Sequence, residues 1–297
     1  MTSASSNNSE EPQAIYRRPG DYDLEHVGDT DDVEFFVEQV TRLRPRRVLE
    51  LASGTGRVTV PLAEAGAVHG FDVVGTVPLA EAGAVHGFDV VGLEVVPEML
   101  QAARERAASA SAAAQERLRF VEGDMRSWGE GEEPFDVVLT PCSSVCHLLT
   151  LEDQLAAWRR AYQNLVPGGR FLVDVVMPDL AIYADSFRSP PREVVEVDLD
   201  TFEEATSTRL LRYRTTRYWS HEQRAHVRFL YDKFVGDAPA ERAVSDFESH
   251  VYYPRELRLL FLHAGFTVEA VYGDYRGRPP GPASPQMIVV GTKESGE

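Results

Sequence analysis

A glycine cluster is the part of this sequence best suited to hold a small ligand. Gly54 and Gly56 stand in the stretch LASGTGR, directly behind the apolar segment RRVLELA at residues 46–52. Glycine lets the backbone approach a ligand closely, and the helix that follows such a loop points free N–H groups at it. The dinucleotide-binding pattern needs a third glycine, but Thr59 occupies that position. The loop therefore predicts a ligand site and argues against NAD.

Acidic residues stand at the ends of three successive strand-like segments. Glu50 precedes the glycines, Glu94 ends FDVVGLE, and Asp124 follows LRFVEG. A carboxylate beside the glycines attracts an ammonium and repels a pyrophosphate, and one at the end of the second strand takes both hydroxyls of a ribose. S-adenosylmethionine carries an ammonium, a ribose and an adenine amino group, and it has no phosphate. We therefore expect S-adenosylmethionine as the ligand.

Helix-like and strand-like segments alternate from about residue 33, which is typical of a parallel sheet with crossover helices. Apolar spacing predicts a helix over 31–43, and the Ala-rich, charged stretch 97–118 is also expected to be helical. The stretch 187–253 breaks this rhythm with period-2 alternation, which indicates an inserted antiparallel β meander. The predicted units are listed in chain order: a disordered tail at 1–20, an α/β core at 21–186, the inserted subdomain at 187–253 as a substrate cover or dimer contact, and a return to the core sheet at 254–297.

In this order, the motifs resemble those of the class I S-adenosylmethionine-dependent methyltransferases, and in particular of bacterial small-molecule members. The resemblance rests on VLELASGTGRVTVPLA, VVGLEVVPEML, FVEGDMRSW, FDVVLTP and LVPGGRFLVDV. It implies an α/β fold with a Rossmann-like, seven-stranded, mostly parallel sheet, helices on both faces and the last strand antiparallel. It also implies a methyltransferase that acts on a nitrogen, oxygen or carbon centre of a small molecule.

The resemblance also implies which residues bind the cofactor. Glu50 and the loop would hold the methionine part, Glu94 the ribose, and Asp124 with Met125 the adenine. Ala52 stands where many members have glycine, and we expect it to be tolerated if its φ is negative. The full predicted cofactor set is Glu50, Ala52, Ser53, Gly54, Thr55, Gly56, Glu94, Val95, Asp124, Met125 and Pro141.

The acceptor side is marked less clearly, because the sulfonium is itself a good methyl donor and needs mainly in-line positioning. His147, in the loop behind the fourth strand, is a candidate base, or else a histidine that only hydrogen-bonds that loop. Tyr22, Tyr218 and Tyr275 are candidate substrate contacts. The meander aromatics, Tyr218 included, could instead form a homodimer interface or pack the meander onto the core.

Composition limits the partners. The net charge of −17 disfavours DNA and RNA, and no apolar run is long enough to span a membrane. The two cysteines, Cys142 and Cys146, indicate reduced thiols in a cytoplasmic protein and no metal site. We expect a small-molecule substrate, and the alternative function is an S-adenosylmethionine-binding protein without transferase activity.

A perfect tandem repeat follows the glycine cluster. Residues 59–75 and 76–92 are the same seventeen letters, TVPLAEAGAVHGFDVVG. Each copy holds a helix piece and a strand piece, but only copy one follows Gly56 and only copy two leads into Glu94. We therefore expect the helix from copy one, the strand from copy two, and a surplus surface excursion at about residues 67–87.

Overall fold

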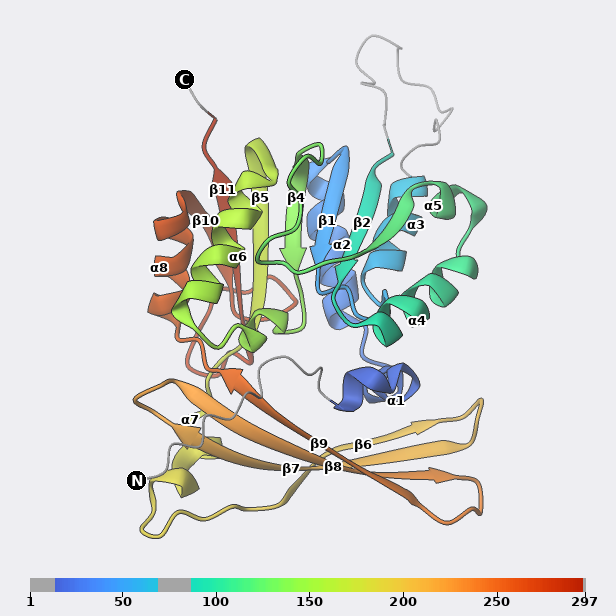
Figure 1. Cartoon of the computed structure of the whole chain (residues 1–297), viewed down its shortest axis with the longest axis vertical. Helices are drawn as coiled ribbons and strands as arrows, with labels where there is room; N and C mark the ends of the chain where they lie inside the picture. Colours follow the sequence, from blue (N-terminus) through green and yellow to red (C-terminus); the bar gives the residue numbers. More distant parts are fainter. Residues whose placement is uncertain (1–13, 69–86, 296–297) are drawn as a thin grey trace.

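A computed structural model describes residues 14–68 and 87–295. These residues form a large sheet flanked by helices and a smaller sheet at one end (Figure 1). The large sheet has seven strands in the order β10-β11-β5-β4-β1-β2-β3. Their bounds are β1 Arg47–Leu51, β2 Asp89–Glu94, β3 Leu118–Glu122, β4 Phe135–Thr140, β5 Leu165–Val176, β10 Phe266–Tyr272 and β11 Gln286–Lys293.

The strand directions confirm the predicted fold. β1 pairs in parallel with β2 and β4, and so do β2 with β3 and β4 with β5. The last strand, β11, is antiparallel to both β5 and β10. Because β1, β2, β4 and β5 run the same way, their carboxyl ends meet at one edge of the sheet, which is where open α/β sheets bind ligands. In Figure 1 this edge faces the small sheet.

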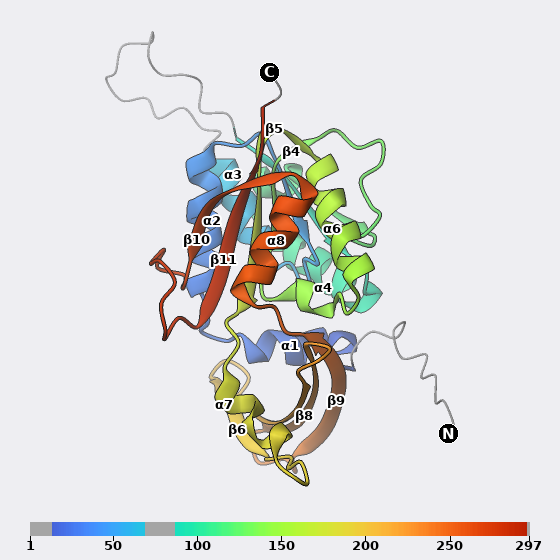
Figure 2. The same cartoon turned by 90° about the vertical axis from the view of Figure 1, so that its left-hand side faces the viewer.

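Helices cover both faces of the large sheet, which gives two apolar layers (Figure 2). α2 (Asp31–Leu43) and α3 (Thr59–Val68) lie on one face, where Phe36 and Leu62 are fully buried. α6 (Leu151–Gln163) and α8 (Pro254–Ala264) lie on the other, where Trp158 and Phe261 are fully buried. This burial fixes the sheet as the rigid support of its carboxyl edge.

The helix expected over 97–118 is two helices, so that prediction is wrong in its continuity. α4 (Pro97–Ala108) and α5 (Ala112–Glu116) are separated by a short break. Ser111 causes the break by capping α5, because its Oγ accepts the Ala114 N–H at 3.2 Å. Glu64 of α3 holds the cap by accepting both the N–H and the hydroxyl of Ser111 at 2.6 Å.

The small sheet is the predicted antiparallel meander. Its strands are β6 Glu196–Glu203, β7 Thr208–Trp219, β8 Arg224–Val235 and β9 Glu241–His250, and each pairs with the next in sequence. Two short helices, α7 (Leu180–Tyr183) and η3 (Ala184–Phe187), connect β5 to it. The insertion therefore begins at the carboxyl edge of the core sheet, directly after β5.

Two N-terminal helices pack against the meander, and the second of them, α1, lies between the two sheets in Figure 1. η1 (Ala14–Arg17) and α1 (Pro19–Glu25) bury Ile15 and Leu24 against Leu210 and Tyr231 of the meander. Residues 14–20, which the sequence analysis placed in a disordered tail, form η1 and the start of α1. Residues 1–13 of that tail lie outside the described residues.

The two repeat copies contribute different elements. α3 is built from copy one at Thr59–Val68, and β2 is built from copy two at Asp89–Glu94. Gly66 packs tightly against the Phe88 carbonyl, where an added Cβ would lie 2.6 Å away, so the used halves contact each other directly. The expected excursion at about 67–87 lies almost entirely outside the described residues.

Among the described residues, no helix is both long and apolar enough to cross a membrane.

Candidate active site

The glycine loop joins β1 to α3 and has three left-handed residues. Ala52, Gly54 and Gly56 have φ of 55°, 56° and 76°. The N–H of Ser53 donates to the Leu93 carbonyl at 2.9 Å, which ties the loop to β2. The condition of a negative φ at Ala52 is not met, and the left-handed region is unfavourable for a residue with a Cβ. The loop therefore keeps a strained backbone at the position where a ligand would approach.

Glu94 ends β2 and is held by backbone amides. One carboxylate oxygen accepts the Gly54 N–H at 2.8 Å, and the other accepts the N–H groups of Val95 and Val96, both at 2.9 Å. The side chain is buried, which raises the pKa of Glu94, although the three amides oppose the shift. Glu94 thus fixes the glycine loop in place and presents a carboxylate beside it.

Glu50 lies inside the protein at the end of β1. Its Oε2 accepts the hydroxyl of Thr59, the first residue of α3, at 2.6 Å. Burial raises the pKa of Glu50 to about 8, although Thr59 and Arg57 lower it. The nearby Ser53 hydroxyl is also buried and has no hydrogen-bond partner among the described residues. A cationic ligand group would favour the ionised form of Glu50 and could satisfy such polar atoms.

The predicted adenine end is more open. Val95 is 57% exposed, and Met125 packs at the margin of the core. Asp124 is engaged by Arg126, whose Nε lies 2.9 Å and 3.0 Å from its two carboxylate oxygens. The Arg126 hydrogen bonds lower the pKa of Asp124. Arg126 also donates to Asp153 at 2.7 Å, so Asp124 belongs to an ion-pair group that the sequence did not reveal.

The N-terminal helix α1 covers the glycine loop. Tyr22 is the nearest neighbour of the open side of Gly54, at 3.9 Å from the place of a Cβ. Asp23 accepts the Thr55 hydroxyl at 2.6 Å and pairs with Arg106 of α4 at 2.8 Å. The structure therefore brings Tyr22 to the predicted methionine end of the site.

His147 ends the short helix η2 (Ser144–His147), and its side chain faces aromatic rings from η1 and β9. Its Nε2 lies 2.9 Å from the hydroxyl of Tyr16 in η1. The Phe247 ring of β9 lies 6.1 Å away, and Tyr22 lies 5.9 Å from Tyr16, centroid to centroid. Burial lowers the pKa of His147 to about 4 and raises that of Tyr16. Sequence reasoning missed Tyr16, and the only available signal was its place six residues before Tyr22.

The other two predicted substrate contacts interact with other side chains. Tyr218 stacks on Tyr183 at 4.4 Å, and its hydroxyl shares a 3.2 Å hydrogen bond with that of Tyr253. Tyr275 donates to Asp174 at 2.7 Å, on the α2 side of the sheet. Their substrate roles stay predictions.

A buried ionic cluster beneath the loop also escaped sequence reasoning. Arg57, directly behind Gly56, donates through both terminal nitrogens to Asp32 of α2 and also to the Cys142 Sγ at 2.8 Å. Burial alone would raise the pKa of Asp32, but Arg57 outweighs it and lowers that pKa. The cluster joins α2, the glycine loop and the loop that leads to His147.

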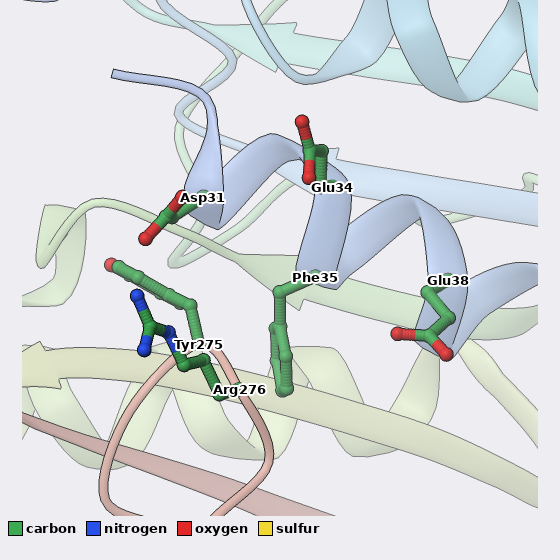
Figure 3. Close-up of a pocket in the computed structure, with 6 residues that line it drawn as sticks. All are labelled: Asp31, Glu34, Phe35, Glu38, Tyr275 and Arg276. Carbon is green, nitrogen blue, oxygen red and sulfur yellow. The ribbon is translucent and has the colours of Figure 1, made fainter.

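A separate surface pocket of about 210 Å³ lies between α2 and the β10–β11 connection (Figure 3). Its lining residues are Asp31, Glu34, Phe35, Glu38, Tyr275 and Arg276. The pocket includes no residue of the glycine loop. Tyr275 is nevertheless shared, because its ring borders the pocket while its hydroxyl reaches the buried Asp174.

Sequence comparison adds two matches. The family model described as Methyltransferase domain matches residues 74–169. The chain is also 22% identical over 249 residues to the Bacillus subtilis (strain 168) protein named "Putative methyltransferase YqeM", which covers 83% of this chain and 84% of that one. The family match begins inside copy one of the repeat, behind the glycine loop.

Solved structures share the fold. The CcbJ methyltransferase from Streptomyces caelestis superposes with a TM-score of 0.67 at 22% identity and covers 89% of this chain and 90% of its own. The sugar N-methyltransferase KedS8 from Streptoalloteichus sp ATCC 53650 does so with a TM-score of 0.64 at 17% identity, covering 99% and 98%.

Three features point to the same ligand: the fold, the methyltransferase domain, and the carboxyl edge at which Glu50 and Glu94 flank the glycine loop. The open backbone at Gly54, the carboxylates of Glu50 and Glu94 and the free Ser53 hydroxyl fit a ligand with an ammonium and a ribose. The chain contains a methyltransferase domain at residues 74–169 and has the fold of solved S-adenosylmethionine-dependent methyltransferases. The solved structure of CalS10 from Micromonospora echinaspora, which shares the fold, is bound to S-adenosylmethionine.

Proposed function

We propose that the chain methylates an amine nitrogen of a small molecule, with an amino sugar as the favoured class. The observation that carries this proposal is the pair formed by Tyr16 and His147, with 2.9 Å between hydroxyl and Nε2. An amine must give up a proton when it is methylated, and a hydrogen-bonded hydroxyl–imidazole pair can take it. The sugar N-methyltransferase KedS8, which has the same fold, supports the choice of acceptor.

The cofactor would be held at the carboxyl edge of the sheet. Glu94 would accept the ribose hydroxyls while it keeps the loop amide of Gly54. Glu50 and the Ser53 hydroxyl would face the methionine end, and Val95 and Met125 would border the adenine. When bound, S-adenosylmethionine supplies a methyl group on a positively charged sulfur, which leaves with the C–S electron pair. The amine lone pair forms the new C–N bond.

Tyr16 and His147 would handle the acceptor proton. Burial keeps the Tyr16 hydroxyl protonated, and the lowered pKa of His147 keeps its imidazole neutral at physiological pH. Tyr16 would accept the proton of the amine and pass its own to Nε2 of His147. The rings of Tyr22 and Phe247 lie beside Tyr16 and His147, where they would contact the acceptor.

A paired acceptor screen tests this function. Purified protein and S-adenosylmethionine are incubated with aminodeoxy sugars and with the matching hydroxy sugars, and methylated product and S-adenosylhomocysteine are measured by mass spectrometry. We expect product only with the amines. His147→Ala should lower turnover roughly 10²–10⁴-fold while cofactor affinity stays unchanged. Methylation of the hydroxy sugars alone, or full turnover by His147→Ala, would contradict the proposal.

A further inference from the structure

The loop that carries His147, residues 141–147, contains an unusual turn. Cys142 and Ser143 have φ of 55° and 57°, so two consecutive residues with a Cβ lie in the left-handed region. Such residues persist only where surrounding contacts over-determine them, and they gather at functional sites. The turn directly precedes η2, whose last residue is His147. Whatever holds this turn also sets where His147 points.

Asp174, at the end of β5, holds the turn from below. Its Oδ2 accepts the Cys142 N–H at 3.2 Å and the Tyr275 hydroxyl at 2.7 Å. The side chain has no exposed surface, and Oδ1 has no hydrogen-bond partner among residues 14–68 and 87–295. A carboxyl group buried this deeply costs stability unless its oxygens are hydrogen-bonded. Because one oxygen of Asp174 lacks a partner in the described part of the chain and the other accepts the N–H of the strained residue Cys142, we interpret this carboxyl group as functional.

The neighbouring contacts anchor the same turn on the same strand. The Ser143 hydroxyl accepts the N–H of Val176, two residues beyond Asp174 on β5, at 3.0 Å. Arg57 holds the Cys142 sulfur from the other side at 2.8 Å. The turn is thus clamped between β5 and the residue that follows the glycine loop. This arrangement links the acceptor side of the site to the cofactor side.

We propose that Asp174 is a positioning residue for methyl transfer: it holds the left-handed turn at Cys142 and Ser143 and so keeps His147 at the acceptor. The proposal rests on the proposed role of His147. Asp174 acts through the loop and does not touch the substrate. Tyr275 supports it by fixing the orientation of its carboxylate.

Asp174→Ala tests the hold on the loop. We expect hydrogen exchange at the amides of 142–148 to accelerate, and kcat for the amine to fall roughly 10²-fold, as misplacement of about 1 Å can do. Cofactor affinity and the KM of the amine should change little. Asp174→Asn should restore most of the rate, because an amide oxygen accepts both hydrogen bonds. Asp232→Ala, which removes another buried carboxylate that Arg242 holds in the meander, is the matched control and should keep full kcat.

Several outcomes would overturn the proposal. Unchanged exchange at 142–148 in Asp174→Ala would do so whatever happens to kcat, because it would show that the loop does not depend on Asp174. An Asn variant as impaired as Ala would do the same. If Asp174→Ala does not fold, Tyr275→Phe removes one donor and should give a smaller change in the same direction; no change in loop exchange would refute the role. His147→Ala, measured alongside, shows separately whether the proposed function fails.

Discussion

At the scale of single residues, Glu94 combines two tasks that can be measured apart. Glu94→Ala removes two charge-assisted hydrogen bonds to the ribose, each worth roughly 1.5–3 kcal/mol, so the Kd for S-adenosylmethionine should rise at least about 10²-fold. It should also lower Tm, because the amides of Gly54, Val95 and Val96 lose their acceptor. Calorimetry and thermal melts check both effects. The exposed Glu98→Ala serves as control, and wild-type affinity in Glu94→Ala would remove Glu94 from the site.

Glu50 and Asp174 reverse the usual pH dependence of a carboxyl group. Burial raises the pKa of Glu50 to about 8 and that of Asp174 to about 7, from ordinary values near about 4. Between these values the folded protein keeps protons that the unfolded chain has lost. The stability from these groups is therefore full below about pH 4 and is lost as the pH rises through 7 to 8. Tm should fall from about pH 5 to about pH 8.5, and less steeply in Glu50→Gln. Equal slopes in thermal melts would contradict this.

Residues of the candidate site could be predicted from the sequence where they stand at the end of a strand. Glu50 and Glu94 could be predicted because each stands at the end of an apolar strand. Glu50 precedes the glycine loop, and it pairs with Gly92 of the strand that Glu94 ends. Tyr16 and the Arg57–Asp32 pair could not, because their contacts join segments far apart in the chain. A polar side chain carries no sequence pattern that names a distant partner. The acceptor side was therefore the least predictable part of the site.

At the scale of elements, helix 31–43 and the meander were predictable because burial imposes a period on the sequence. The break between α4 and α5 was not, since a side-chain cap at Ser111 and Glu64 of another helix decide it. β5 likewise begins at Leu165 and runs through Pro167, Gly168 and Gly169, although proline and glycine are depleted in strands. There, Leu165 pairs with Phe135 and a register shift absorbs the irregular residues.

The glycine loop contains one replaceable element of strain. Ala52→Gly should raise the free energy of unfolding by about 0.5–1 kcal/mol, because relief of the left-handed strain exceeds the added entropy of the unfolded chain. Urea unfolding measures the difference. Ala102→Gly in α4 is the contrasting control and should lower stability by about 1 kcal/mol. A similar loss in both variants would show that Ala52 is not strained.

At the scale of the whole molecule, the fold draws on half of each repeat copy. Deleting residues 59–75 removes copy one, but the identical helix segment of copy two then follows the glycine loop, and the strand that leads into Glu94 is kept. We expect the shortened protein to bind S-adenosylmethionine at least as well and to unfold at the same or higher temperature, because a long connection adds only modest closure entropy. Calorimetry and thermal melts provide the measurements. Loss of folding or binding would mean that the assignment of the copies is wrong.

The repeat also supplies an internal control. Leu62 is fully buried in α3, and Leu79 is its counterpart in copy two, outside the described residues. Leu62→Ala should cost about 2–5 kcal/mol of stability, as for other buried leucines. The same change at Leu79 should cost clearly less. Equal losses in chemical denaturation would show that copy two also supports the core.

The use of α3 from one copy and β2 from the other has a consequence for inheritance. Because the copies are identical and adjacent, every in-frame loss of seventeen residues that begins between 59 and 76 yields the same chain. Deletions with many different breakpoints in the gene thus give the same protein, in which Gly56, one helix, one strand and Glu94 follow each other with no altered residue. A lineage could discard the duplication in a single event, at almost any point along it, without passing through a form that lacks the cofactor edge.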